Sequence, residues 1–471
     1  SCSDSVKVSR TLDEMPVIFP DYNGVVIPPN IAPLNFALND QDAGSCAVFS
    51  FGGQQFEVKG EKGGFVIPPS KWKKLLESAA GNSIQVTVQV KQGNEWVAYS
   101  PFTIQVAAEK IDSYLAYRLI DPGYELWNKM GIYQRDLESY TQTPIIENKM
   151  SGNNCVNCHS FCMQNPDKML FHMRETFPGT ILVDGDKIEK LNTKTRETIS
   201  SLVYPSWHPS GKYVAFSVNT TKQAFHLNDK NRVEVYDEAS DVVVYDVEKH
   251  EIVTASTIFS KDAFETFPTF SPDGKTLYFC TAEARPIPQE YSEVKYNLCS
   301  ISFDPATRTF GTQVDTLYNA KSGGMSASFP RVSPDGRYLL YTLSGYGNFS
   351  IWHKDADLYM TDLQTGTSRS LAEVNSDDVE SYHSWSSNSR WFVFSSRRID
   401  GLYTRPYIAY VGEDGKVGKP FLLPQKDVGF YPSFMKSFNI PEFITGKVKV
   451  QGRALAIKAK EDKGTDVRFA K

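Results

Sequence analysis

The chain has 471 residues, of which 41% are hydrophobic and 13% aromatic, so it can bury at least one large core and is expected to form two domains. This composition excludes a disordered chain. The net charge is −5 and the basic residues are scattered, which gives no reason to expect a nucleic-acid partner. No apolar run approaches the length of a transmembrane helix.

Residues 1–23 are interpreted as a tether. Cys2 lies in the opening Ser-Cys-Ser-Asp, far from every other cysteine. A mature bacterial lipoprotein has this appearance once its signal peptide is removed, so we expect Cys2 to carry lipid; the alternative is an incidental terminal cysteine. Lipidation predicts a periplasmic or outer-membrane lipoprotein that meets the membrane only through this cysteine.

Residues 24–107 predict a small, separate β domain. The segment 83–90 alternates apolar and polar residues, turns at Gly93-Asn94 and returns through 95–99 and 102–106. One short helix is expected from Ser70, as its cap, to Gly81. We expect an immunoglobulin-like sandwich.

Residues 108–150 are rich in aromatic side chains and are interpreted as a packed connector that lies across the following domain. The aromatic residues are Tyr114, Tyr117, Tyr124, Trp127, Tyr133 and Tyr140. The connector leads into Cys155-Val-Asn-Cys158-His159, whose C-x-x-C-H spacing suits covalent haem. Arg118 and Arg135 are therefore candidates to meet haem propionates, because a guanidinium group suits carboxylates. Surface ion pairs are the commoner role for such arginines.

The motif Cys155-Val-Asn-Cys158-His159 specifies covalent chemistry. The C-x-x-C-H spacing suits two thioether bonds to haem vinyl groups, with His159 as an axial ligand of the iron. A zinc site, an iron–sulfur site or a disulfide pair are the alternatives. Zinc would need a second Cys/His pair at comparable spacing, and the chain has none.

The second half of the chain is periodic, with units about 50–60 residues apart. Each unit pairs an aromatic start with a Ser-Pro-Asp-Gly type of turn, and has room for four strands. Such units must pack radially, so residues 151–446 predict a β-propeller of about six blades, with 447–471 as a basic strand or tail. The copies are Tyr204–Ser217, Phe267–Cys280, Phe329–Thr342 and Tyr382–Ser395, with a fainter one at Tyr431–Phe434 and another upstream at Asn165–Phe171.

One histidine breaks the repeat. The residues expected at the start of the inner strands are Pro205, Pro268, Pro330, His383 and Pro432. Because Tyr382-His-Ser-Trp385 resembles Cys158-His-Ser-Phe161, the C-x-x-C-H motif is expected at a blade start, on the same rim as His383. Candidates for the second axial position of the iron are Met163, Met169, His172, Met173, His208, His353 and His383, and the position could also be open.

The repeats resemble the TolB-type, WD40-like (PD40) family, whose blades carry the core F-P-x-[WF]-S-P-D-G-[KR]-x-[LIV]. The resemblance covers about 160–440, and the copy at 382–395 lacks Pro-Asp-Gly. The whole chain looks like the TolB-like lipoproteins of Bacteroidetes that combine this propeller with C-x-x-C-H. The resemblance implies an exported protein with a binding surface, and no named reaction.

Three functions are therefore considered. The first is an exported protein with one covalent haem c that transfers electrons and docks an unknown redox or envelope partner. The second is a non-redox binding scaffold. The third is a metal-dependent propeller enzyme, such as a polysaccharide lyase, with His208, His353 and His383 around a divalent cation. We identify no catalytic residues, and the sequence favours a carrier or binding protein over an enzyme. Protein made in a recombinant host could lack the haem.

Overall fold

The computed structural model describes residues 6–39, 44–121 and 129–471. The chain divides into two compact units, the first of which comprises Ser1–Ser113, Asp136–Thr141 and Tyr407–Met435. The second comprises Tyr114–Arg135, Gln142–Pro406 and Lys436–Lys471. The predictions for Cys2, Tyr124 and Trp127 lie outside the described residues. Within the described ranges, no helix is long and apolar enough to cross a membrane.

The first unit is built on two sheets. The larger has the order β1-β9-β8-β10-β3, with β5 and β6 added beside β8, and the smaller has the order β2-β4-β7. The alternation at 83–90 does form a long strand with one buried face, because its apolar residues lie on alternate positions. The elements are β1 (Val8–Thr11), β2 (Ile18–Phe19), β3 (Val26–Ile27), β4 (Phe36–Leu38), β5 (Ser45–Phe51), β6 (Gln54–Lys59), β7 (Gly64–Phe65), α1 (Pro69–Ala79), β8 (Ser83–Gln92), β9 (Glu95–Ala98) and β10 (Phe102–Val106).

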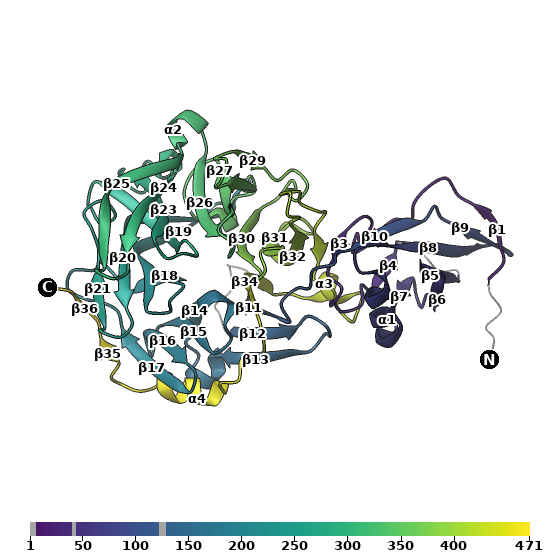
Figure 1. Ribbon diagram of the computed structural model, residues 1–471, viewed down its shortest axis with the longest axis horizontal. Helices are drawn as coiled ribbons and strands as arrows, with labels where there is room; N and C mark the ends of the chain where they lie inside the picture. Colours follow the sequence, from purple (N-terminus) through teal and green to yellow (C-terminus); the bar gives the residue numbers. More distant parts are fainter. Residues whose placement is uncertain (1–5, 40–43, 122–128) are drawn as a thin grey trace. The chain divides into compact units, whose positions relative to one another are not determined.

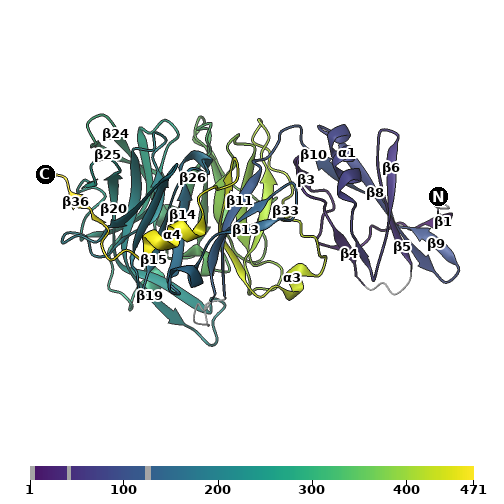
Figure 2. The ribbon, with the colours of Figure 1, turned by 90° about the horizontal axis from the view of Figure 1, so that it is seen from below.

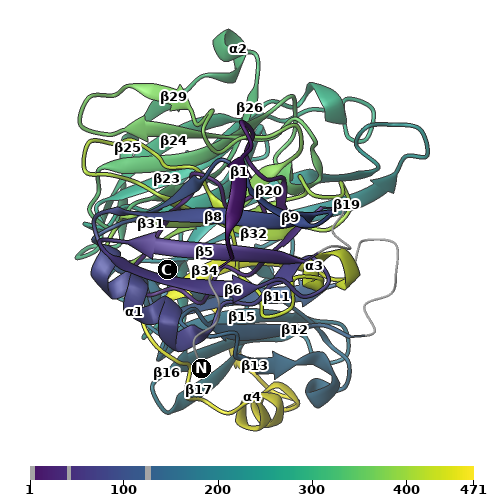
Figure 3. The same ribbon diagram turned by 90° about the vertical axis from the view of Figure 1, so that its right-hand side faces the viewer.

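Helix α1 lies beside β5 (Figure 3) and contacts it. It buries one stripe of side chains. Trp72, Leu75, Leu76 and Ala79 form that stripe, at the spacing of one helix face. The expected cap is wrong: α1 begins at Pro69, with Pro68 at the N-cap position, so Ser70 lies inside the first turn. Proline suits the first turn of a helix because a backbone N–H at this position would have no hydrogen-bond acceptor within the helix.

Six sheets form a six-bladed β-propeller, as the repeats predict, and the described chain has far more strand than helix. The second unit holds five of the blades and the first two strands of the sixth. Its sheets radiate from a common centre, and consecutive inner strands contact one another in a closed circle (Figure 1). In sheet order the blades are β13 (Gln142–Glu147), β12 (Gly131–Asp136), β11 (Tyr114–Ile120), β34 (Ser437–Ile444); β14 (Cys155–Phe161), β15 (Lys168–Arg174), β16 (Gly179–Asp184), β17 (Lys187–Asn192), β35 (Thr465–Asp466); β18 (Leu202–Trp207), β19 (Tyr213–Phe225), β20 (Val233–Asp246), β21 (Glu251–Val253), β36 (Arg468–Phe469); β22 (Ala263–Phe270), β23 (Thr276–Glu283), β24 (Asn297–Asp304), β25 (Thr309–Tyr318); β26 (Ser326–Val332), β27 (Tyr338–Ser344), β28 (Asp357–Asp362), β29 (Ser368–Ser370); and β30 (Glu380–Trp385), β31 (Trp391–Ser396), β32 (Arg405–Tyr410), β33 (Phe421–Leu422).

The aromatic segment 108–150 differs from its prediction as a connector. Its strands β11, β12 and β13 form a blade of the propeller, and β34 from the far end of the chain pairs antiparallel with β11. This pairing closes the ring of blades. The aromatic side chains are explained by burial inside a blade: Tyr117, for example, is fully buried against Phe438 of β34.

The C-terminal segment 447–471 contacts or pairs with strands of three blades. Helix α4 (Gly452–Ala459) contacts β13 and β17 (Figure 2), and β35 and β36 add in parallel to β17 and β21. Lys190 of β17 donates hydrogen bonds to the carbonyl oxygens of Ala459 and Glu461 at 2.8 and 2.6 Å. These carbonyls lie at the C-terminal end of α4, where helices lack internal donors.

Apolar side chains fill the spaces between neighbouring blades. One cluster joins Leu170 and Leu182 of one blade to Val214 and Phe216 of the next. The Ser-Pro-Asp-Gly turns lie at the ends of the inner hairpins, as at Gly274, whose N–H donates to the Ser271 carbonyl at 2.9 Å. Gly274 has φ +71°, a conformation that favours glycine.

Candidate functional site

Every blade has the same distortion in its inner strand. Six residues of these strands have positive φ, between 49° and 57°, and at each of them the register with the neighbouring strand shifts. This is the geometry of a β-bulge. The six residues are Cys158, Tyr204, Phe267, Phe329, Tyr382 and Ile440.

The residue after each bulge is proline or histidine. His159 and His383 occupy the position that Pro205, Pro268, Pro330 and Pro441 occupy elsewhere. The prediction for Pro432 is wrong: Pro432 lies in the short helix α3 (Phe430–Ser433), and the sixth bulge precedes Pro441 in β34. The Tyr-Pro-Ser-Phe pattern at 431–434 is thus a coincidence of composition.

The six bulge residues surround the centre of the propeller, and aromatic rings dominate them. The ring centroids of Tyr204 and Phe267 are 4.7 Å apart, those of Phe267 and Phe329 4.9 Å, and those of Phe329 and Tyr382 5.2 Å. Cys158 is the smallest of the six. A cavity of about 420 Å³ opens beside it.

The cavity brings the two motif cysteines together with basic and aromatic side chains. Its walls come from five blades of the second unit. The lining residues are Arg118, Ile120, Asp121, Met130, Cys155, Asn157, Cys158, Arg174, Tyr204, Thr221, Lys222, Gln223, Val235, Phe349, Ile351, Trp352, Tyr382, Asn439 and Ile440.

Both motif cysteines are free thiols. Cys155 is half-buried and pairs in register with Arg174 of β15, so the two side chains lie on the same face of the sheet. Burial raises the pKa of Cys155, against the opposing effects of Arg118 and Arg174. Cys155 is therefore a neutral thiol near pH 7, within electrostatic reach of two guanidinium groups.

His159 is buried and does not line the cavity. Burial, assisted by Arg118, lowers its pKa to about 3 against the backbone of Ile440, so the imidazole is neutral. Neither ring nitrogen makes a hydrogen bond of standard geometry within the described structure. His159 thus has lone-pair capacity without a partner, but its side chain is enclosed in the wall of the propeller.

His383 shows what a histidine at this position does elsewhere. Its Nε2 donates to the carbonyl oxygen of Phe329, the bulge residue of the preceding blade, at 2.5 Å, with Leu340 O at 3.3 Å. Burial lowers its pKa to about 3. This hydrogen bond accounts for His383 as a structural residue, and His383 does not line the cavity.

The other predicted ligands are dispersed. His208 bonds to the Gly274 carbonyl at 2.9 Å and to Ser210, and His353 lies 3.2 Å from the Glu234 carboxylate. The prediction that His208, His353 and His383 gather a cation is therefore wrong, and the described ranges contain no cluster of three metal-ligating His, Cys, Asp or Glu residues. Met163 is 42% exposed after β14, outside the cavity lining.

Of the two predicted arginines, one lies at the cavity. Arg118 lines it and donates from Nη1 to the Val156 carbonyl at 3.4 Å. Arg135 of β12 does not line the cavity. Its side chain is buried within its own blade, near Tyr117 of β11. Arg174 and Lys222 also line the cavity and were not predicted from the sequence. Only the hairpin register of β14 with β15, anchored by the bulge, could have placed Arg174 opposite Cys155.

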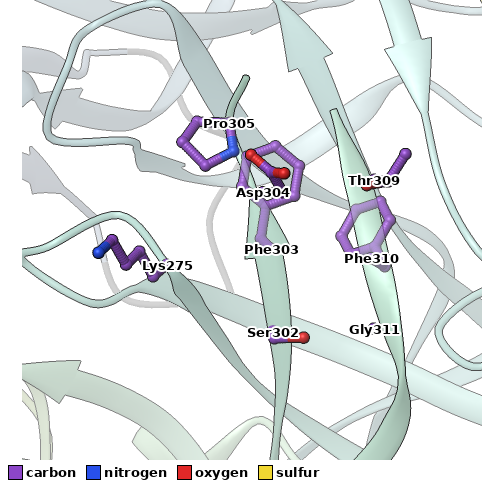
Figure 4. Close-up of a pocket in the computed structure, with 8 residues that line it drawn as sticks. All are labelled: Lys275, Ser302, Phe303, Asp304, Pro305, Thr309, Phe310 and Gly311. Carbon is purple, nitrogen blue, oxygen red and sulfur yellow. The ribbon is translucent and has the colours of Figure 1, made fainter. Parts of the chain in front are cut away.

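A second hollow, of about 410 Å³, lies over β24 and β25 (Figure 4). Phe303 and Phe310 lie side by side there, with ring centroids 5.2 Å apart. Lys275 and Asp304 are its charged residues. It lacks the convergent polar groups and thiols of the first cavity, so the cavity at Cys158 is the stronger candidate site.

No family model matches the chain, and no curated protein matches it. Among solved structures, the chain is similar to a proposed 6-phosphogluconolactonase from Bacteroides fragilis, with 11% identity, a TM-score of 0.33, and 83% of this chain and 98% of the other covered. A DUF4784 family protein from Bacteroides caccae has 6% identity, a TM-score of 0.31 and coverage of 78% and 94%. The arabinanase Arb43A of Bacillus subtilis has 11% identity and a TM-score of 0.27, with 48% of this chain and 79% of the other covered.

Proposed function

We propose that the cavity at Cys158 holds a haem c, attached through thioether bonds to Cys155 and Cys158, and that the protein is an exported electron carrier that docks a partner. The observation that carries this proposal is that the thiols of Cys155 and Cys158 line a single cavity. Cys158 is also the one cysteine among the six bulge residues. Haem c, when bound, supplies one-electron redox chemistry.

The residues at the cavity fit such a group in three respects. Two free thiols stand at the spacing of c-type attachment. Tyr204, Phe349, Trp352 and Tyr382 supply aromatic walls, and Arg118 and Arg174 suit carboxylates. His159, the fourth element, is neutral, and neither of its ring nitrogens makes a hydrogen bond of standard geometry in the described structure, so a nitrogen is free to bind iron. Its side chain has to leave the wall to reach the cavity.

The test is a pyridine haemochrome spectrum of protein made in cells with the machinery for c-type maturation. We expect a thioether-type band that persists in denaturing gels and is lost in Cys155→Ser/Cys158→Ser. Cys299→Ser, which changes a buried thiol outside the cavity, is the matched control and keeps the band. Protein that emerges without haem, with Cys155 and Cys158 still alkylatable, contradicts the proposal.

One observation favours a second candidate, a binding scaffold that takes its ligand without thioether bonds. His159 has the same place in its blade as His383, whose role is structural. If His159 is also structural and no thioether bonds form, we expect Cys155→Ser/Cys158→Ser to bind the ligand as well as the unaltered protein does. The haemochrome test and this comparison separate the two functions.

For location, we propose the bacterial envelope, periplasmic or outer-membrane, with lipid on Cys2 and no other contact with the membrane. The support is the isolated cysteine in the sequence and the need of c-type maturation for an exported chain. Intact mass of the protein from membranes, compared with Cys2→Ser, tests this. A Cys2 without added acyl mass contradicts it.

A further inference from the structure

The cavity at Cys158 has an excess of positive charge that thioether chemistry does not need. Arg118, Arg174 and Lys222 line it, and Asp121 is the one carboxylate among the described lining residues. Asp121 already forms an ion pair with Lys436, with 2.6 Å between Asp121 Oδ1 and Lys436 Nζ. Lys436 also donates to the Lys129 carbonyl at 2.7 Å, which holds this pair in place. The carboxylate is therefore committed elsewhere.

Among the residues that the structure describes, the three cations have no such partner: no Asp or Glu oxygen there lies within 4 Å of Arg118, Arg174 or Lys222. Arg118 is the most telling, because its Nε is buried and makes no hydrogen bond, and its one hydrogen bond, to Val156 O, is long at 3.4 Å. A buried guanidinium N–H without an acceptor costs free energy unless a ligand supplies one.

The three side chains come from separate elements that the fold brings to one cavity. Arg118 lies in β11, opposite Asn439 of the closing strand β34. Arg174 ends β15, opposite Cys155. Lys222 stands in the extended hairpin of β19 and β20, paired with Tyr236. Arg118 and Arg174 line the same cavity as Cys155, and both lie within electrostatic reach of its thiol.

We infer that Arg118, Arg174 and Lys222 form an anion-binding site that recognises the carboxylates of a ligand with a flat aromatic body. The aromatic body is indicated by the walls, since Tyr204, Phe349 and Tyr382 line the same cavity. Two guanidinium groups suit two carboxylates, because each offers a planar pair of donors. This inference rests on the proposed binding role of the cavity, but not on thioether attachment.

The experiment uses the full chain carrying Cys155→Ser/Cys158→Ser, which cannot form thioethers. Metal-free protoporphyrin IX, with two free carboxylates, and its dimethyl ester, with none, are titrated against it by fluorescence. We expect the acid to bind about tenfold or more tighter than the ester, as a charge-assisted contact requires. In this background Arg118→Gln and Arg174→Gln weaken binding of the acid about tenfold and leave the ester unchanged.

Lys212→Gln is the matched control, because Lys212 is a basic residue of the same blade as Lys222 outside the cavity. It should change neither titration. Equal binding of acid and ester, equal loss of both in the arginine variants, or an equal loss in Lys212→Gln overturns the inference. If the acid still binds more tightly than the ester, but the unaltered protein never acquires covalent haem in the haemochrome test, the haem proposal is overturned and this inference stands.

Discussion

His159 and His383 stand at the same position of two blades, each directly after an inner-strand residue with positive φ. In the other four blades this position holds proline. Proline is compatible with a bulge because the N–H at this point is not part of the strand ladder. The fold itself therefore accepts proline at this position.

His159→Pro should consequently fold. We expect its free energy of unfolding in urea to lie within about 1.5 kcal/mol of the unaltered protein, because four blades already combine a positive-φ residue with proline. Leu170→Pro is the control: β15 lies between β14 and β16, so its N–H groups serve one ladder or the other. That variant should fail to fold. A His159→Pro protein as unstable as Leu170→Pro contradicts the shared role of the position.

The pH dependence of stability should reveal a buried acid pair between two blades. Burial, followed by repulsion from Asp241, raises the pKa of Glu265 to about 8. Because the folded protein holds this proton above the ordinary glutamate range, the stability that Glu265 contributes is complete below pH 4.5 and is lost as the pH rises through 8.

Glu265→Gln should therefore flatten the fall in the urea midpoint between pH 5 and pH 8. Part of the slope remains, because burial also raises the pKa of Glu442 to about 8. Glu283→Gln, an exposed residue at the end of β23, is the control and keeps the full slope. If Glu265→Gln has the same profile as the unaltered protein, Glu265 is ionised in the folded state.

The contact between Lys190 and α4 should stabilise the C-terminal fastening. Lys190→Met leaves the carbonyls of Ala459 and Glu461 without their donor, so we expect a loss of about 1–3 kcal/mol in unfolding free energy. Lys187→Met, on the same strand, removes only an exposed ion pair with Glu189 and should cost less than about 0.5 kcal/mol. Equal effects of the two variants would show that the contact adds nothing.

Two glycines at the same place in successive repeats test the packing of His208. A Cβ on Gly274 would lie 2.2 Å from His208 Nε2, while one on Gly336 would meet nothing within 4 Å. Both have positive φ, +71° and +76°, so alanine costs about 1–2 kcal/mol of backbone strain at either. Gly274→Ala should be the more damaging in thermal unfolding, since it also displaces the His208 ring.

The propeller was predictable from sequence because four units repeat both the turn chemistry and the aromatic start. The closing blade was not, since β11 and β34 lie at opposite ends of the propeller sequence and Ile440-Pro441 lacks the aromatic residue of its equivalents. At the site, the cysteines and Arg118 lie together at one cavity, while Arg174 and Lys222 depend on the register of hairpins. The histidines near the inner strands satisfy backbone carbonyls or a buried carboxylate, which residue type alone does not reveal.

Filling the gap in the ring of bulge residues should close the cavity. Phe267 and Phe329 show that phenylalanine fits this backbone conformation, with φ of 49° and 57°. Cys158→Phe should therefore fold with a melting temperature near that of the unaltered protein, while its ring occupies space beside Tyr204, Tyr382 and Ile440. We expect protoporphyrin IX binding to fall by about tenfold or more. Cys158→Ala also removes the thiol but leaves the cavity open, so it should retain that binding. If Cys158→Phe binds as Cys158→Ala does, the ligand lies elsewhere and the cavity at Cys158 is not the binding site.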